Sequence, residues 1–188
     1  MRKSLITAVV TASLFTLAAC GNEDDTDAAG GHNDADVTFA QEMIPHHQQA
    51  IEMAELAESR AESQEVKDLA ADIEAAQGPE IETLTGWLES WGEDVPDQGM
   101  SGMDHGDMSS DDMGGMMTEG EMADLEAASG AEFDQMFLTM MIEHHEGAIE
   151  MAKTEQSEGE FPEAVDMAKE IETTQAEEIQ TMQDLLNS

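Results

Sequence analysis

The sequence predicts an all-α fold, an antiparallel four-helix bundle made of two repeated helical hairpins. Residues 43–54 (MIPHHQQAIEMA) recur 98 positions later as residues 141–152 (MIEHHEGAIEMA), with nine of twelve residues identical. The same offset continues into a second helical pattern in each half. The strand signal is weak, because the chain has no Tyr and its β-branched residues are scattered. Two hairpins of this length can bury their apolar stripes against each other as one bundle.

The first 19 residues are expected to be a signal peptide rather than part of the fold. Arg2 and Lys3 precede an apolar run over residues 5–17, which is too short for a permanent membrane span. Residues 17–20 (LAAC) resemble a bacterial lipobox, so cleavage would leave Cys20 as a lipidated N-terminus that attaches the protein to the membrane. An ordinary secretory signal with a free cysteine is the alternative. Because Cys20 is the only cysteine, no intramolecular disulfide can form.

The bundle is expected over residues 36–188, after a flexible acidic tether at residues 20–35. In the first repeat, residues 36–91, one helix is expected over about 37–62. A second is expected over about 64–91, with Ser63 as its N-cap.

The second repeat, residues 119–188, follows a Met-rich linker at residues 92–118 that lacks helical periodicity. A short helix is expected near 119–128, after a capping-box pattern that starts at Thr118. A second such pattern starts at Ser129 and precedes a helix over about 131–156. A glycine–proline break then leads into the last helix, over about 162–187.

The chain is strongly acidic, with 44 Asp and Glu against 6 Lys and Arg and a formal net charge of −38. Such a surface excludes a nucleic-acid partner, since phosphate binding needs basic patches. The acidity is interpreted mainly as a solvated surface suited to a salty habitat, because most carboxylates fall on the polar faces of the helices. A field that attracts cations is then a by-product.

Four of the six histidines lie in the repeated motif, where methionines bracket each pair. On a helical wheel, His47 and His145 fall near the centre of the apolar stripe, whereas His46 and His144 fall at its edge. Imidazole and thioether are soft-to-borderline ligands that together favour copper over magnesium or calcium. The candidate metal-ligating residues of the motif are Met43, His46, His47, Met53, Met141, His144, His145 and Met151.

Polar residues also interrupt the apolar stripes of the two partner helices. Gln77 and Glu80 intrude on one stripe, and Gln175 and Glu178 intrude on the other. Buried polar groups are costly unless they are paired or bound to metal, so these residues and the histidines form either a hydrogen-bonded core network or a metal site. Both interpretations stay open, and methionines at helical spacing are more often ordinary core residues than ligands.

The linker carries methionines in a polar, glycine-rich segment (GMSGMDHGDMSSDDMGGMM, residues 99–117), where they have no core to fill. Methionine thioethers bind Cu(I) without losing a proton, so a flexible chain can wrap one ion with two or three ligands. Such sites would be weaker and more exchangeable than those of the bundle. The linker candidates are Met100, Met103, His105, Met108, Met113, Met116 and Met117.

The motif differs from that of di-iron carboxylate bundles, which present Glu-x-x-His on two of their helices. Met43 and Met141 stand three residues before His46 and His144, where that motif would have Glu. Met-x-x-His favours Cu(I) and argues against a di-iron oxidase. No Cys or activated-Ser arrangement for nucleophilic catalysis is visible in the sequence. The protein is therefore expected not to be an enzyme.

At these residues the sequence resembles the family known as domain of unknown function 305. The pattern F-x-x-x-M-I-x-H-H-x-x-A-I-x-M-A, followed by Q-x-x-E-I on a second helix, matches residues 39–54 with 77–81 and residues 137–152 with 175–179. The resemblance implies an exported, ferritin-like four-helix bundle, with copper bound through Met and His in some members. Pro45 stands where the second copy has Glu143, and it is expected to kink the first helix.

Three functions are consistent with the sequence. The first is a lipid-anchored, extracytoplasmic protein of the cell envelope that sequesters Cu(I) or passes it to an unknown transfer partner. The second is a non-metal helical interaction module of the envelope, whose inward His, Gln and Glu form a structural network. The third, a metal-dependent redox enzyme, has the least support. Copper titration separates the first two, and turnover with Cu(I) or Fe(II) and oxygen tests the third.

Overall fold

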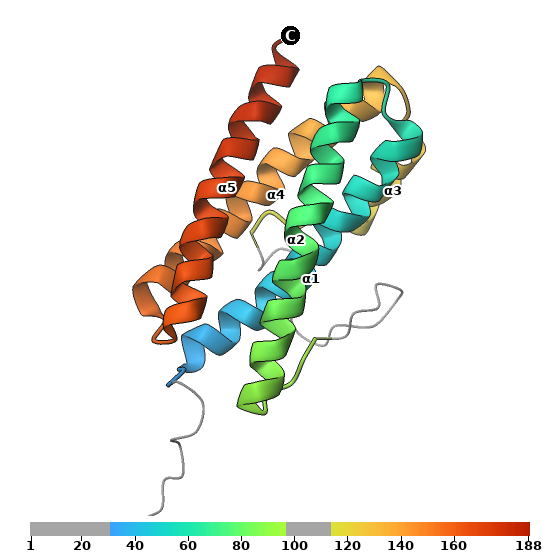
Figure 1. The fold of residues 1–188 in the computed structure, drawn as a ribbon. Coiled ribbons are helices and arrows are strands. Elements are labelled where there is room, and N and C mark those ends of the chain that lie inside the picture. The colour runs from blue at the N-terminus through green and yellow to red at the C-terminus, as the bar shows by residue number, and fades with distance from the viewer. Residues whose placement is uncertain (1–30, 97–113) are drawn as a thin grey trace, which may run out of the picture.

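The computed structural model describes residues 31–96 and 114–188, which form five α-helices (Figure 1). No strand occurs within these two ranges, so the predicted all-α class is confirmed. No helix in the same ranges is long and apolar enough to cross a membrane. The helices are α1 (Asp34–Arg60), α2 (Gln64–Trp91), α3 (Glu119–Ala127), α4 (Ala131–Glu158) and α5 (Pro162–Leu186).

Polar caps start three of the helices. Asn33 caps α1, Ser63 caps α2 as predicted, and Thr118 forms the predicted capping box at the start of α3. The predicted Ser129 cap of α4 is wrong. Gly130 is the N-cap residue of α4, and its φ of 65° is a backbone conformation that favours glycine.

Two segments are more ordered than the sequence suggests. α1 begins at Asp34, inside the predicted tether, because Asn33 and Asp36 satisfy each other's backbone N–H groups in a capping box. α1 then continues past Pro45 to Arg60. The last residues of the predicted linker, 114–118, are also described and lead directly into α3.

The long helices pack in three pairs. α1 packs along α2, α4 packs along α5, and α1 packs against α4 at the helix crossing. In Figure 1, α1 and α4 run side by side behind α2 and α5. α2 and α5 make few contacts with each other, and a cleft of about 510 Å³ lies between them. The arrangement is therefore more open on this side than a closed four-helix bundle.

The core consists of two apolar clusters with a polar layer between them. One cluster combines the C-terminal half of α1 and the N-terminal half of α4 with residues of α2, α3 and α5. The other combines the opposite halves of α1 and α4 with residues of α2 and α5. Along each long helix, buried polar residues fall between the members of the two clusters, whereas buried Asp36 and Glu155 lie beyond one cluster, towards a helix end. The polar layer includes His46, His47, Gln77, His144, His145 and Gln175.

Each helix pair also holds the loop of the other pair through an aspartate. The Asp36 carboxylate at the start of α1 accepts hydrogen bonds from the N–H groups of residues 160 and 161, at 3.2 and 2.9 Å. Asp134 at the start of α4 accepts hydrogen bonds from the N–H groups of residues 62 and 63, at 3.0 and 2.8 Å. The two sets of residues differ by the same 98 positions. The duplication thus extends to the contacts between the two halves.

Several residues predicted to bind lipid or metal lie outside the described ranges. These residues are Cys20, Met100, Met103, His105, Met108 and Met113.

Candidate metal centre

The rings of His46 and His144 stack on each other where α1 crosses α4. Their centroids lie 3.7 Å apart with an interplanar angle of 29°, and both residues are fully buried. The two residues are 98 positions apart, so equivalent positions of the two repeats are in direct contact. Residues that contact their own equivalents lie at the axis relating the two halves. The helical wheel places these histidines at the edge of the stripe, but the crossing helix covers that edge and buries them.

Both rings are uncharged near neutral pH. Burial, followed by the neighbouring His145, lowers the pKa of His144 to about 3. Burial and the neighbouring His144 and His47 hold the pKa of His46 well below its usual value. A neutral imidazole keeps a lone pair on one ring nitrogen, and this is the form that binds a metal ion.

The ring nitrogens of this pair are incompletely satisfied. His144 Nε2 lies 2.9 Å from the His46 carbonyl oxygen, and His144 Nδ1 lies 3.1 Å from the Gly115 carbonyl oxygen. A neutral ring has one N–H group, so one of these contacts places a nitrogen lone pair against an oxygen lone pair. Among the residues that the structure describes, neither ring nitrogen of His46 has a hydrogen-bond partner. Buried polar atoms of this kind are rare and costly, and a bound metal ion would satisfy a free lone pair.

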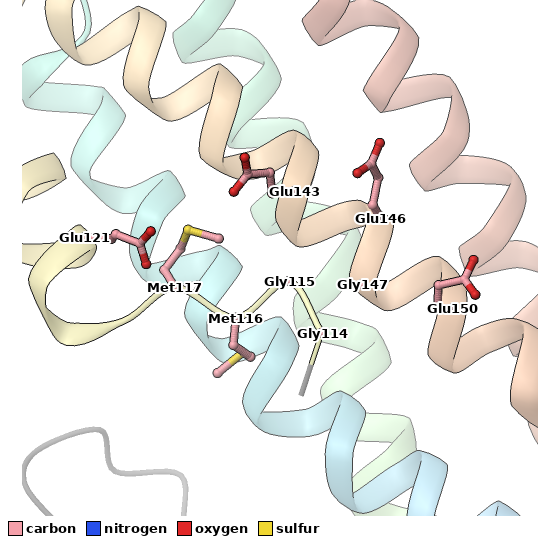
Figure 2. A pocket seen from close by; sticks show the side chains of 9 residues that line it. All are labelled: Gly114, Gly115, Met116, Met117, Glu121, Glu143, Glu146, Gly147 and Glu150. Atoms are coloured by element: carbon pink, nitrogen blue, oxygen red, sulfur yellow. The ribbon is translucent and has the colours of Figure 1, made fainter. Parts of the chain in front are cut away.

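Residues 114–117, called the strap here, pass between α1 and α4 beside this pair (Figure 2). The Gly115 carbonyl oxygen contacts His144. The Gly114 backbone lies near the His46 ring but does not form a hydrogen bond with it. The strap thus brings two predicted ligands of the linker, Met116 and Met117, to the same part of the bundle. Both methionines line a cleft of about 400 Å³ together with Glu121, Glu143, Glu146 and Glu150, and Met117 is the buried one of the two.

His47 and His145 make matching contacts with glutamates of the partner helices. His47 Nε2 lies 2.6 Å from Glu80 Oε2, and His145 Nε2 lies 2.6 Å from Glu178 Oε2. These contacts satisfy one nitrogen of each ring, as the network interpretation predicts. Within residues 31–96 and 114–188, other polar atoms of the layer have no hydrogen-bond partner, namely Nδ1 of both rings and Oε1 of Gln77 and Gln175.

The four methionines of the repeated motif pack with the core. Met43, Met53 and Met141 are fully buried in the apolar clusters, and Met151 is half-buried against one of them. In the described part of the chain, no three His, Cys, Asp or Glu side chains gather in a way that could hold a metal ion. A copper ion at the helix crossing would therefore combine imidazole with thioether donors, a donor set that suits Cu(I).

Sequence reasoning missed three residues beside the histidine pair, which are Gln49, Gly115 and Gly147. A signal for two of them was present. The two copies of the motif differ at only three positions, 45/143, 48/146 and 49/147. All three differing residues of the second copy line the cleft beside the strap. The positions at which the two copies differ therefore lie where the second copy borders the strap, a segment outside the repeated motif.

Comparison with known proteins gives one family. The family model described as Domain of unknown function (DUF305) matches residues 36–186. A DUF305 protein of Streptomyces coelicolor, described as secreted, is 32% identical, with a TM-score of 0.70 over 81% of this chain and 92% of that chain. A DUF305 fragment from Deinococcus radiodurans is 30% identical, with a TM-score of 0.72 over 82% of this chain and 97% of that chain.

A third similar structure is that of CopM, which was solved in a Cu(II)-bound form. It is 34% identical to this chain, with a TM-score of 0.68, and the match covers 81% of this chain and 95% of that one. CopM was also solved in Cu(I)-bound and Ag-bound forms, which are 32% identical to this chain with TM-scores of 0.65 and 0.63. No curated protein matches the chain.

Proposed function

The chain belongs to the family described as Domain of unknown function (DUF305), and from this premise we propose that it is a lipid-anchored, extracytoplasmic copper-binding protein. The observation that carries the proposal is the buried His46 ring, which stacks on His144 and has two nitrogens without a partner among the described residues. CopM, a protein of similar fold, was solved with copper bound.

Cu(I) suits the donors at the helix crossing better than a hard cation does. Neutral imidazole and thioether are the ligands that favour it. CopM was solved with Cu(I) and with Ag, and Ag⁺ is, like Cu(I), a soft monovalent ion. The strap carries two thioethers, those of Met116 and Met117, next in the chain to the Gly115 carbonyl oxygen that contacts His144.

The proposed role is sequestration or transfer of Cu(I), without catalysis. Both rings of the pair are fully buried, which favours holding an ion over reacting it with a second substrate. The signal peptide and the lipobox at Cys20 support an envelope location, as does the relative from Streptomyces coelicolor that is described as secreted. The ferritin-like bundle of two repeated hairpins belongs to the same proposal, and the contacts that recur at the 98-residue offset support it.

A structural interaction module is the second candidate function. It is favoured by the contacts of His47 with Glu80 and of His145 with Glu178, which form a network without a metal ion. A wild-type protein that binds no copper would leave this alternative as the better account.

Competition titration against a Cu(I) chelator tests the copper proposal. His46→Ala is expected to lose one tightly bound Cu(I), because it removes both unpartnered nitrogens of the pair. His32→Ala is the matched control, since His32 stacks on Trp91 at 4.5 Å instead of joining the polar layer. Helical content is compared by circular dichroism. Unchanged Cu(I) stoichiometry and affinity in a folded His46→Ala protein would overturn the assignment.

A further inference from the structure

The strap is held to α1 by one side chain. The Gln49 Nε2 amide donates a hydrogen bond of 2.8 Å to the Met117 carbonyl oxygen, and the Met117 N–H donates one of 2.6 Å to Gln49 Oε1. Both hydrogen bonds are buried, and Gln49 is only 3% exposed. An amide that pairs in this way with one backbone residue fixes both its position and its direction.

The strap meets α4 through contact between glycines. A Cβ atom added at Gly147 would lie 1.8 Å from the Gly114 carbonyl oxygen, which is far inside van der Waals contact. Gly115 has a φ of 85°, and a Cβ atom there would lie 2.6 Å from the Glu143 carbonyl oxygen. A side chain at either position would prevent the strap from lying where it does.

The strap occupies the space between the histidine pair and solvent. On its inner side, the Gly115 carbonyl contacts His144 Nδ1 at 3.1 Å. On its outer side, Gly114, Gly115 and Met116 line the cleft of about 400 Å³, whereas neither His46 nor His144 lines it (Figure 2). Both histidines are fully buried beneath this cover.

The two repeats contribute to the strap unequally. Gln49 and Gly147 occupy the same position of the repeated motif, 98 residues apart. One copy therefore supplies the side chain that binds the strap, and the other supplies the gap that admits it. The strap lies across the axis that relates the two repeats, so it contacts both of them. Its contacts with the two repeats can differ only where their residues differ.

We propose that the strap covers the His46–His144 site and that its undocking controls the exchange of bound copper with solvent. The hydrogen bonds of Gln49 act as the latch that holds the strap in place, and Gly147 leaves the space that it occupies. This inference rests on the proposed copper-binding function. Copper leaves the pair only while the strap is undocked, so weakening the latch speeds release.

The first measurement tests, without copper, whether the Gln49 hydrogen bonds hold the strap in place. Hydrogen exchange of the Met117 N–H, followed in the metal-free full chain, is expected to be about tenfold faster in Gln49→Ala, because two buried hydrogen bonds are lost. Gln64→Ala is the control, since the exposed Gln64 side chain bonds to Asp68 within its own helix. Unchanged exchange in Gln49→Ala would overturn the latch.

The second measurement reads copper exchange from the same proteins. Transfer of Cu(I) from the loaded full chain to an excess of a chelator is expected to be about tenfold faster in Gln49→Ala, following the loss of the two hydrogen bonds. Gly147→Ala is also expected to speed transfer, because its methyl group displaces Gly114. Gly78→Ala on α2 is the matched control, as a Cβ atom there meets nothing within 4 Å.

The outcomes separate this inference from the copper proposal. Faster hydrogen exchange with unchanged copper transfer would overturn the cover while leaving the copper site standing. A wild-type chain that binds no Cu(I) would overturn the proposed function, and the control of copper would fall with it. Ala at position 147 raises helix propensity in α4, so a folded variant is expected for the comparison.

Discussion

The helix pair α1–α2 and the helix pair α4–α5 share two kinds of polar contact. The His47–Glu80 contact and the His145–Glu178 contact both measure 2.6 Å, and each pair's first helix carries an aspartate that holds the other pair's loop. These contacts join two helices or two hairpins, so both halves need them equally. Their recurrence indicates that they support the fold.

The two helix pairs differ at positions where one pair makes a contact that the other lacks. Gln49 forms hydrogen bonds with the strap, whereas the equivalent Gly147 leaves room for the strap to pass close to α4. Glu155 stands beside Asp36, whereas the equivalent residue of the first repeat is Ala57. Residues with a functional role are thus expected at positions that lie on the axis between the two repeats or that differ between them.

The largest expected difference concerns the two equivalent core phenylalanines. Phe137 stacks on Phe133 with centroids 5.8 Å apart, whereas the residue equivalent to Phe133 in the first repeat is Ala35. Phe137→Ala is expected to lower the free energy of unfolding by about 4–5 kcal/mol and Phe39→Ala by about 3–4 kcal/mol. Urea denaturation of both variants measures this difference. An equal or reversed order would contradict the role given to the aromatic pair.

The two His–Glu contacts are expected to be energetically equivalent. Glu80→Ala and Glu178→Ala each leave a buried His Nε2 without its partner and should lower the free energy of unfolding by about 1–3 kcal/mol. Because both contacts measure 2.6 Å and both histidines are fully buried, the two losses should be equal within the error of the measurement. Glu82→Ala, at an exposed position of α2, is the control. A clearly larger loss in one repeat would show that one of the pairs has a further role.

The smallest expected effect depends on pH and belongs to the second repeat alone. Burial, followed by the neighbouring Asp36 carboxylate, raises the pKa of Glu155 to about 8. Between the ordinary pKa of a glutamate and pH 8, the unfolded chain has lost this proton while the folded chain keeps it, so stability falls as pH rises. Glu155→Gln removes this loss.

Melting temperatures measured between pH 5 and 9 check that sign. Glu155→Gln should melt about 3–5 °C above the wild type at pH 9, and the gain should shrink towards pH 5. Glu177→Gln, at an exposed position of α5, is the control. A gain that is constant across this range would mean that the charge of Glu155 is not its cause.

The repeat and its helical periodicity predicted the fold class and the helix ranges, because both are local patterns in the sequence. The same patterns also placed His47 and His145 inside the core, where they lie. They could not predict the stacking of His46 on His144, since that depends on how α1 crosses α4. The contacts of the strap were equally inaccessible, because close packing between glycines and a single amide contact leave no periodic signal.

Anomalous diffraction at the copper edge, from crystals of the protein grown with Cu(I), shows directly whether copper binds to the His46–His144 pair. A peak is expected within coordination distance of a His46 ring nitrogen, beneath the strap at the crossing of α1 and α4. Copper peaks at other positions, with none beside His46, would contradict this expectation.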